Sequence, residues 1–322
     1  MIKKILKIVF FSIVAAGCSS NNSRPDWVDM PYQNYNQKHY LTAVGQGDNK
    51  EQASSRALAN MAKFFVVNIA DNSSDLSQAS IAKTAYETSN QISRHIKTQT
   101  KCSLEGVEIE QSWLSPSKEY FALAVLDKKV AVLRLTQAIK SADQTTQKLL
   151  VYSSTQAPNI IKKLQALSKA QVEQSKREGL NQQLLLISEN NIKPQISSSE
   201  IAAQIRGELA FLKVAAQAQN EQAQHFLQSA ISELGITINQ DSKLQLKAEL
   251  DTFAPFEQQG WHWQRGSFQL SLLNEAQTIS QKRWEFKISA QQPKLLATRL
   301  QDQLEANVAD YLFELLTLDL EI

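Results

Sequence analysis

The sequence predicts an α+β protein of two small domains, each an antiparallel sheet packed on helices, joined by a long helical hairpin. Apolar and polar residues alternate in segments of both halves, as over 107–110 and 244–250, and such alternation is typical of half-buried strands. Over 127–187 the apolar residues instead recur at helical spacing. A length of 322 residues fits two modest domains.

Residues 1–17 have the layout of a bacterial export signal. A basic segment with Lys3, Lys4 and Lys7 precedes an apolar run over 8–16, which is about half of the ~20 residues that a spanning helix needs. We therefore expect this signal to be removed. Its removal takes three of the 34 Lys and Arg residues and leaves 31 against 32 Asp and Glu. A body so near neutrality is not expected to bind nucleic acid.

The segment Val14-Ala15-Ala16-Gly17-Cys18 is similar to the lipobox of bacterial lipoproteins, whose cysteine is acylated and becomes the first residue of the mature chain. Ala15 departs from the family pattern, which most often has Leu there. Acyl chains on Cys18, at ~0.8 kcal/mol per buried methylene, would hold the protein on a membrane. In the lipoproteins that this segment resembles, a residue other than Asp after the cysteine, here Ser19, implies sorting to the outer membrane. Residues 18–24 are expected to form a short tether. The alternative is a secreted protein in which Cys18 is incidental.

The first α+β domain is expected over 25–135. Asp48 is expected to accept hydrogen bonds from the first turn of a helix, with Glu51 three residues later as in a capping box. The predicted elements, in chain order, are a strand over 39–45, a turn over 45–48, a helix that starts at this turn and continues through the alanine-rich run 53–70, a helix or loop over 76–101, and a hairpin of strands over 107–110 and 120–126.

Motif residues of this domain occur in an order shared with one family. They are Pro25-Asp26-Trp27-Val28, Tyr40-Leu41, Ala43-Val44-Gly45 with Gly47, then Ala53, Ala57, Ala59-Asn60 and Ala62, and finally Trp113 with Tyr120-Phe121-Ala122-Leu123-Ala124-Val125. With these residues about a third of the chain resembles the LPP-twenty family of bacterial outer-membrane lipoproteins. The resemblance implies a non-catalytic envelope lipoprotein, and some members are surface antigens or flagellum-associated components. It brings no catalytic residue to this sequence.

The rest of the chain is divided by Pro158 and by a polar segment. Pro158 is expected to end one helix and open the next, which gives a helical hairpin over 136–187, followed by a linker over 188–199. The second α+β domain, over 200–322, is loosely similar to periplasmic activators of peptidoglycan synthases and to curli-secretion-type domains. Its predicted elements are a helix over 221–234, strands over 236–238, 244–250, 268–272 and 284–288, and a closing helix with Leu300, Leu304, Val308, Leu312 and Leu315.

No motif predicts catalysis, a metal site or a cofactor. The four histidines form no pair at metal-binding helical spacing and no cluster with cysteine. Gly45-x-Gly47 lacks the third glycine of a dinucleotide-binding loop, since Lys50 stands there, and it fits a strand-to-helix turn better. Glu108 and Glu110 share one strand face, where a solvated pair is more common than an acid–base pair. Cys102 is expected to be a small buried side chain.

The segment Trp261-His262-Trp263-Gln264-Arg265 is the candidate contact with a partner. Trp and Arg are enriched among the residues that dominate interface energies, and a loop between two strands would present Trp261, Trp263 and Arg265 to solvent. The alternative is that one tryptophan covers the core of the small sheet.

These observations predict a lipid-anchored cell-envelope lipoprotein with a non-catalytic binding or assembly role at the outer membrane. Its partners would be the membrane, through acylated Cys18, and an envelope protein, with the body in the periplasm or at the cell surface. A flagellar association stays open. The alternative function is a regulatory lipoprotein that activates a peptidoglycan synthase through its C-terminal domain.

Overall fold

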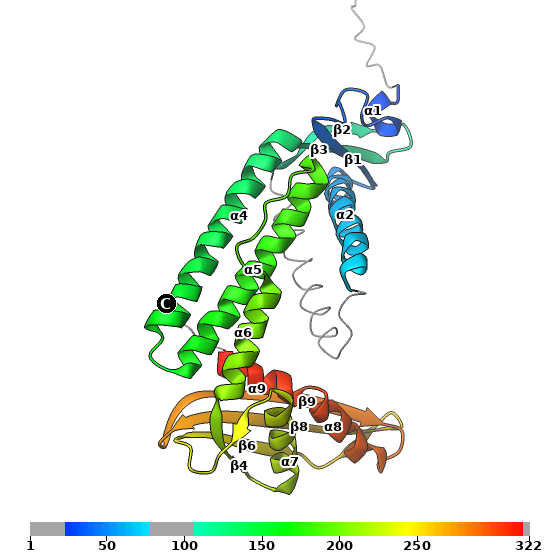
Figure 1. Cartoon of the computed structure of the whole chain (residues 1–322). Helices are drawn as coiled ribbons and strands as arrows, with labels where there is room; N and C mark the ends of the chain where they lie inside the picture. Colours follow the sequence, from blue (N-terminus) through cyan, green and yellow to red (C-terminus); the bar gives the residue numbers. More distant parts are fainter. Residues whose placement is uncertain (1–22, 78–105, 318–322) are drawn as a thin grey trace, which may run out of the picture. The chain divides into compact units, whose positions relative to one another are not determined.

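The computed structural model describes residues 23–77 and 106–317, except for the side chains of 66–77. Figure 1 shows the arrangement of its helices and sheets. Antiparallel strand pairs packed against helices confirm the predicted α+β class. The predicted export signal, Cys18, Cys102 and nearly all of the segment 76–101 lie outside the described residues.

The chain divides into two compact units. Among the described residues, the first contains 23–67 and 106–131, and the second contains 68–77 and 132–317. Each unit has its own described sheet, and the strand order is β1-β3-β2 in the first. The second sheet has the order β5-β4-β6-β8-β7, with β9 paired to the other side of β8.

The first unit places β3 between two layers of helix. Its elements are α1 (Asp26–Asp29), β1 (Tyr40–Gly47), the first part of α2 (Lys50–Ser77), β2 (Val107–Leu114) and β3 (Tyr120–Asp127). The predicted first strand and the predicted hairpin are confirmed. Phe121 of β3 packs with Trp27 and Val28 of α1, and the small, fully buried Ala122 and Ala124 alternate with it along the strand. Burial of both faces explains the continuous apolar run of β3.

The contact between β1 and α2 depends on two glycines that we expected in a turn. Both lie inside β1, and a Cβ atom added to Gly45 would come within 2.1 Å of the Ala57 nitrogen. The predicted cap at Asp48 is also wrong. The helix begins at Lys50, so Asn49 is the residue whose side chain accepts from the Gln52 amide, at 2.8 Å.

The helices of the second unit begin with α4 (Lys128–Val151), which continues into a π-helical turn, η1 (Tyr152–Gln156); α5 (Ile160–Ser188) and α6 (Ser198–Phe211) follow. Helices therefore flank Pro158 on both sides, as its position predicts, and Asn159 caps α5. The apolar pattern does not predict α6. Its start carries a capping box between Ser197 and Glu200, which is a signature visible in the sequence.

The second sheet is mixed, with parallel pairing around β4 and antiparallel pairing among β6, β7, β8 and β9. Its elements are β4 (Lys213–Ala218), α7 (Glu221–Glu233), β5 (Thr237–Ile238), β6 (Leu244–Thr252), β7 (Phe256–Gln258), β8 (Trp261–Asn274), β9 (Gln277–Ala290), α8 (Leu295–Glu305) and α9 (Val308–Thr317). β4 pairs in parallel with β5 and β6. The predicted closing helix is two helices, α8 and α9, and all five residues of its apolar stripe are buried.

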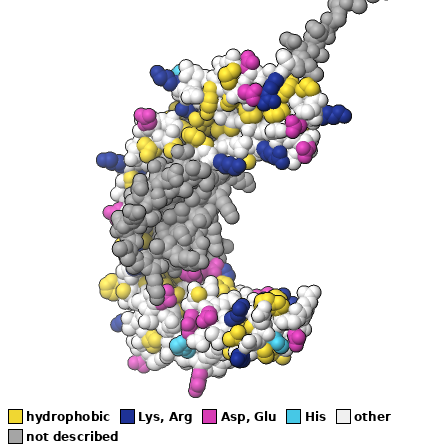
Figure 2. Space-filling model, turned by 90° about the vertical axis from the view of Figure 1, so that its right-hand side faces the viewer, with side chains coloured by type: hydrophobic (Ala, Val, Ile, Leu, Met, Phe, Trp, Pro, Cys, Tyr) yellow, Lys and Arg dark blue, Asp and Glu magenta, His cyan; other side chains and the backbone are white. Residues whose placement is uncertain are grey.

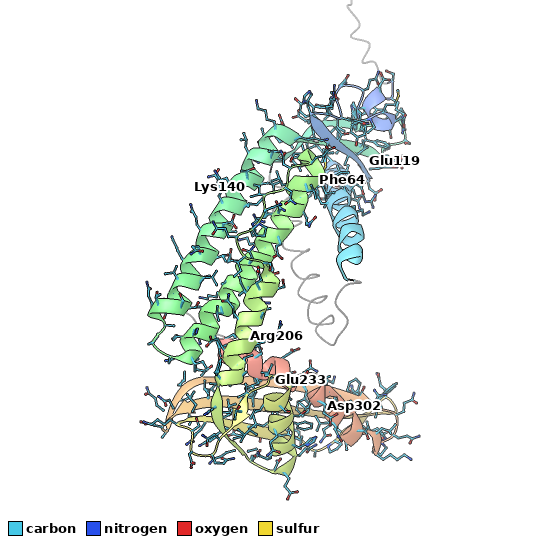
Figure 3. The ribbon with its side chains drawn as sticks, in the orientation of Figure 1. Phe64, Glu119, Lys140, Arg206, Glu233 and Asp302 are labelled. Atoms are coloured by element: carbon cyan, nitrogen blue, oxygen red, sulfur yellow. The ribbon has the colours of Figure 1, made fainter. Side chains whose placement is uncertain are left out.

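One apolar cluster joins this sheet to the helices of the second unit. Phe268, Leu270 and Leu272 of β8 belong to it, together with buried residues of α7, α8 and α9. Leu164 of α5 and Ile201 of α6 belong to the same cluster. In Figure 3, Glu233 and Asp302 mark the outer surfaces of α7 and α8. The helices α5 and α6 are therefore part of the core that supports the sheet.

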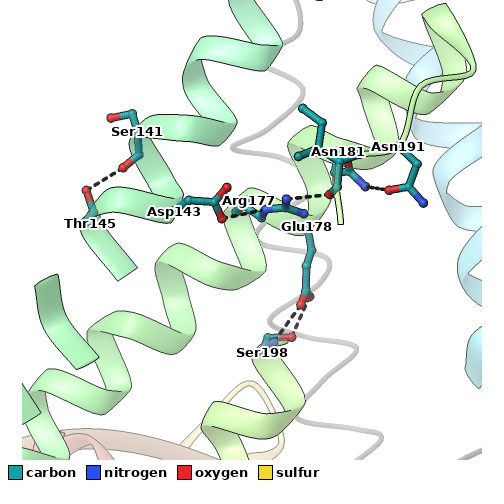
Figure 4. Close-up of polar contacts among 9 residues, drawn as sticks. Ser141, Asp143, Thr145, Arg177, Glu178, Asn181, Asn191 and Ser198 are labelled. Atoms are coloured by element: carbon teal, nitrogen blue, oxygen red, sulfur yellow. Dashed lines mark hydrogen bonds and ion pairs between the residues drawn. The ribbon is translucent and has the colours of Figure 1, made fainter. Parts of the chain in front are cut away.

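A buried arginine joins α4, α5 and the segment between α5 and α6 (Figure 4). The guanidinium of Arg177 donates from Nε to Oδ1 of Asp143 at 3.0 Å and from Nη2 to the carbonyl oxygen of Ile192 at 2.6 Å. The side-chain oxygen of Asn181 accepts from the Ile192 amide at 2.9 Å. Because a buried guanidinium needs acceptors, this network fixes the path of the chain from α5 to α6.

Gly45→Ala is expected to destabilise the first unit, because the new methyl group would overlap the backbone of α2. Such overpacking typically costs about 1–3 kcal/mol, so the midpoint of urea unfolding should fall. Gly207→Ala in α6 is the matched control, since nothing lies within 4 Å of a Cβ added there. It should leave stability unchanged or raise it by up to ~1 kcal/mol. Equal losses in the two variants would contradict a contact specific to Gly45.

Asp143→Ala is expected to lower the free energy of unfolding by about 3 kcal/mol, because it leaves the buried Arg177 without its counter-charge. Asp143 is 36% exposed, which keeps the cost at the low end of the range for buried pairs. Glu208→Ala is the comparison, because it breaks the more exposed pair of Glu208 with Lys163, which also joins α5 to a neighbouring helix. That change should cost less than about 1 kcal/mol in the same urea titration.

Candidate partner-binding surface

The three predicted contact residues lie on a strand and not in a loop. Trp261, Trp263 and Arg265 are the first odd-numbered residues of β8, which is paired with β7 and β9 along this stretch. The prediction of a loop is wrong because the turn comes earlier. Gln259 and Gly260 both have positive φ angles, 54° and 74°, and form the two-residue turn between β7 and β8.

Strand alternation places these three side chains on one face of the sheet. Phe268 and the even-numbered residues that follow it face the helices and the apolar core. The odd-numbered side chains therefore point to the opposite face. Cross-strand register adds two residues to that face, Phe256 opposite Trp263 and Lys287 opposite Arg265.

Two cations lie over aromatic rings on this face. The Lys287 Nζ atom is 4.1 Å from the centre of the Trp263 ring, and the Arg265 Cζ atom is 5.5 Å from the centre of the Phe256 ring. Within the described part of the chain, neither cation pairs with a carboxylate. Trp261 completes the group and is 38% exposed. We call Phe256, Trp261, Trp263, Arg265 and Lys287 the aromatic–cation patch.

Two charged side chains farther along the same face have hydrogen-bond partners there. Arg283 pairs with Asp251 at 3.1 Å, and Gln269 donates to Glu249 at 2.9 Å. In the patch, by contrast, cation–π contacts contribute only about 0.5–1 kcal/mol each at exposed sites, so both cations can still bind an anionic group. The Trp263 indole nitrogen is buried and has no hydrogen-bond acceptor among the described residues. The surface of the patch thus combines the exposed ring of Trp261 with two cations that pair with no carboxylate of the described residues.

A different tryptophan of the second unit covers the core. Trp284 packs against the apolar cluster, stacks on Tyr311 with 4.4 Å between ring centres, and donates to the Glu314 carboxylate at 2.9 Å. Burial, with Asp310 and Glu314 nearby, raises the pKa of Tyr311. Trp261 and Trp263 are not part of that cluster. The alternative that one of these two covers the core therefore applies to Trp284 instead.

The remaining candidate residues from the sequence include two carboxylates on β2. Glu108 and Glu110 are both exposed on β2. The described residues contain no group of three or more His, Cys, Asp or Glu side chains that could hold a metal ion. No helix in the described ranges is long and apolar enough to cross a membrane. Phe256 and Lys287 were not predicted, because strand register is not visible in the sequence.

The first unit contains the buried Trp27, the β2–β3 hairpin and the close contact of Gly45 with α2. This unit is also the part of the chain that is similar to a known family. Residues 25–127 match the LPP20 lipoprotein family. The LPP20 segment ends where β3 ends, and it confirms the resemblance drawn from the motif residues. The aromatic–cation patch lies outside the LPP20 segment. No curated protein matches the sequence.

Solved structures are also similar to this chain. A secreted protein of Helicobacter pylori aligns over 87% of this chain and 98% of its own, with 15% identity and a TM-score of 0.44. A minor lipoprotein of Acinetobacter baumannii aligns over 33% of this chain and 87% of its own, with 14% identity and a TM-score of 0.25.

Single tryptophan substitutions should separate the patch from the core. Trp261→Ala is expected to change the free energy of unfolding by less than about 1 kcal/mol, because the side chain is exposed and outside the apolar cluster. Trp284→Ala should cost about 3 kcal/mol or more, because it removes core packing and the hydrogen bond to Glu314. Urea unfolding of both variants measures this difference. A large loss in Trp261→Ala would assign that residue to the core.

Proposed function

We propose that this protein is a lipid-anchored cell-envelope lipoprotein, held through Cys18, with a non-catalytic binding or assembly role at the outer membrane. One observation carries the proposal. The LPP20 lipoprotein match begins at residue 25, seven residues after the cysteine that ends a lipobox-like segment, Cys18. The order of signal, cysteine, tether and family domain is what a lipoprotein requires.

The start of the described chain suits a short anchor. Arg24 forms two hydrogen bonds of 2.7 Å with the carboxylate of Asp29 in α1, and its guanidinium lies 5.2 Å from the centre of the Phe121 ring. The end of the tether is therefore attached to the core of the first unit. Residues 19–24 span at most ~20 Å at ~3.3–3.6 Å per residue, so acylated Cys18 would hold this unit close to the membrane surface.

The binding role is assigned to the aromatic–cation patch. Arg265 and Lys287 favour an anionic group, and the exposed ring of Trp261 favours apolar contact next to it. The partner with this chemistry is an envelope protein that presents a carboxylate beside an apolar side chain. Confinement to one membrane raises the effective concentration of such a partner, so modest affinity is sufficient.

Cell fractionation of wild type and Cys18→Ser tests the anchor. Wild type should sediment with the outer membrane and carry acyl chains on Cys18, whereas Cys18→Ser should lose both the acylation and the outer-membrane location. Mass spectrometry of the amino-terminal peptide measures the acylation directly. A wild-type protein without acyl groups would contradict the proposal.

Charge reversal tests the patch. Cross-linking mass spectrometry in cells should place an acidic segment of one envelope protein against β7–β9, and Arg265→Glu should reduce those cross-links about tenfold. Lys247→Glu is the matched control, because Lys247 lies on the same face of the sheet but outside the patch. Reversing the partner's carboxylate to Lys should restore binding to Arg265→Glu. Unchanged cross-links in Arg265→Glu would remove the patch from the proposal.

A further inference from the structure

A second candidate site lies in the first unit, where α2 lies against β1. A cleft of about 570 Å³ is lined there by Arg24, Arg56, Lys63, Gln46, Asn60 and Phe121, among other residues. Three of these side chains are cations, and no carboxylate of the described residues lines the cleft. Figure 2 shows Lys and Arg side chains beside an apolar area on one face of the first unit.

One stripe of α2 supplies most of the polar lining. Arg56, Asn60 and Lys63 follow one another at spacings of four and three residues, which places them on the same side of the helix. Arg56 Nη1 donates to the carbonyl oxygen of Gln46 at 2.8 Å, and Asn60 Nδ2 donates to that of Val44 at 2.9 Å. Both carbonyls belong to β1, an edge strand of its sheet. The α2 side chains are therefore held in place by the strand.

These bonds leave most of the cationic donors unused. A guanidinium has five N–H donors, and Arg56 uses one of them in its hydrogen bond to the carbonyl oxygen of Gln46. Lys63 has three donors and makes one 3.4 Å contact, with the side-chain oxygen of Asn60. Neither Arg56 nor Lys63 pairs with a carboxylate within the described ranges. Both cations are available to an anionic ligand in the cleft.

The carboxylates next to the cleft are already engaged. Asp29 holds Arg24, and these hydrogen bonds lower the pKa of the Asp29 carboxyl. Glu119, labelled in Figure 3, accepts a hydrogen bond from the side chain of Gln46 at 2.7 Å. The Gln46 amide is neutral and leaves the charge of Glu119 in place, so the three cations of the cleft exceed these two carboxylates by one positive charge.

We propose that this cleft binds the phosphate group of an anionic phospholipid headgroup, with Arg56 and Lys63 as the phosphate ligands. Guanidinium and ammonium groups are the side chains that proteins use most for phosphate. The Phe121 ring and Val28 line the same cleft and suit the less polar glycerol part of a headgroup. The lipid would then hold the first unit in one orientation on the membrane.

The choice of a lipid over another anion rests on the proposed anchor at Cys18. Arg24 lines the cleft and lies six residues after Cys18, within ~20 Å of chain. The membrane that receives the acyl chains is therefore the nearest concentrated source of phosphate. Each Lys or Arg near an anionic membrane surface contributes about 1 kcal/mol, which corresponds to about fivefold in affinity.

Vesicle sedimentation tests the cleft without the acyl anchor. The protein used is the chain from residue 18 onward with Cys18→Ser, and the vesicles contain phosphatidylcholine alone or mixed with phosphatidylglycerol. It should bind only the mixed vesicles. Lys63→Gln should weaken binding about fivefold, and Arg56→Gln with Lys63→Gln about 25-fold. Because Asn60 is the hydrogen-bond partner of Lys63 among the described residues, at 3.4 Å, replacement of Lys63 is not expected to affect folding.

Lys38→Gln is the matched control, because Lys38 is exposed in the same unit and does not line the cleft. It should weaken vesicle binding less than about twofold. An equal loss in Lys38→Gln and Lys63→Gln would overturn the site in favour of general attraction to the membrane. Failure of the parent protein to bind the mixed vesicles would also overturn it.

Titration with inorganic phosphate, followed by isothermal calorimetry, separates the two sources of phosphate. Tight binding of inorganic phosphate without vesicle binding would overturn the lipid assignment. The anchor is judged independently, by acylation of wild type in cells. An unacylated wild type would remove the anchor while the vesicle measurement still decides the cleft.

Discussion

The burial of the Arg177 guanidinium is the constraint on which the arrangement of the second unit depends. A charge removed from water must find acceptors, and this one finds them in α4 and in the carbonyl of Ile192. The chain after α5 is therefore drawn back along that helix before α6 begins at Ser198. Because α6 leads directly into β4, the position of the first strand of the second sheet follows from this polar contact.

Periodicity was sufficient to predict the elements that bury one face or are buried throughout. The alternation over 244–250 became β6, and the continuous apolar run over 120–126 became the doubly covered β3. The cap of α2 was missed by one residue, because Asp48 and Asn49 are adjacent residues of types that both favour an N-cap, and Asn49 is the one that accepts from the Gln52 amide. β4 was missed because Lys213–Ala218 is a short segment without alternation, and its pairing with β5 and β6, which stabilises it as a strand, is not visible in the local sequence.

Residue type predicted part of the patch, and strand register supplied the rest. Two tryptophans and an arginine within five residues already indicate an interface. Their neighbours Phe256 and Lys287 come from two other strands, and only the pairing of β8 with β7 and β9 brings them together. The cleft was harder to predict, because Arg24 comes from the tether and the α2 stripe reads in the sequence as an ordinary solvated helix face.

The near neutrality of the chain makes the aromatic–cation patch and the cleft of the first unit important for binding. With 34 Lys and Arg against 32 Asp and Glu, no large net charge can draw the protein to an anionic surface over a long range. Attraction must then come from cations that lack a local carboxylate, such as Arg56 and Lys63 in the first unit and Arg265 and Lys287 in the second. Each pair of cations lies beside aromatic or apolar side chains, so an anion alone would contact the cations and leave the apolar side chains without a partner. A ligand that combines an anionic group with an apolar one contacts both kinds of side chain, which favours a headgroup with its glycerol in one unit and an acidic protein segment in the other.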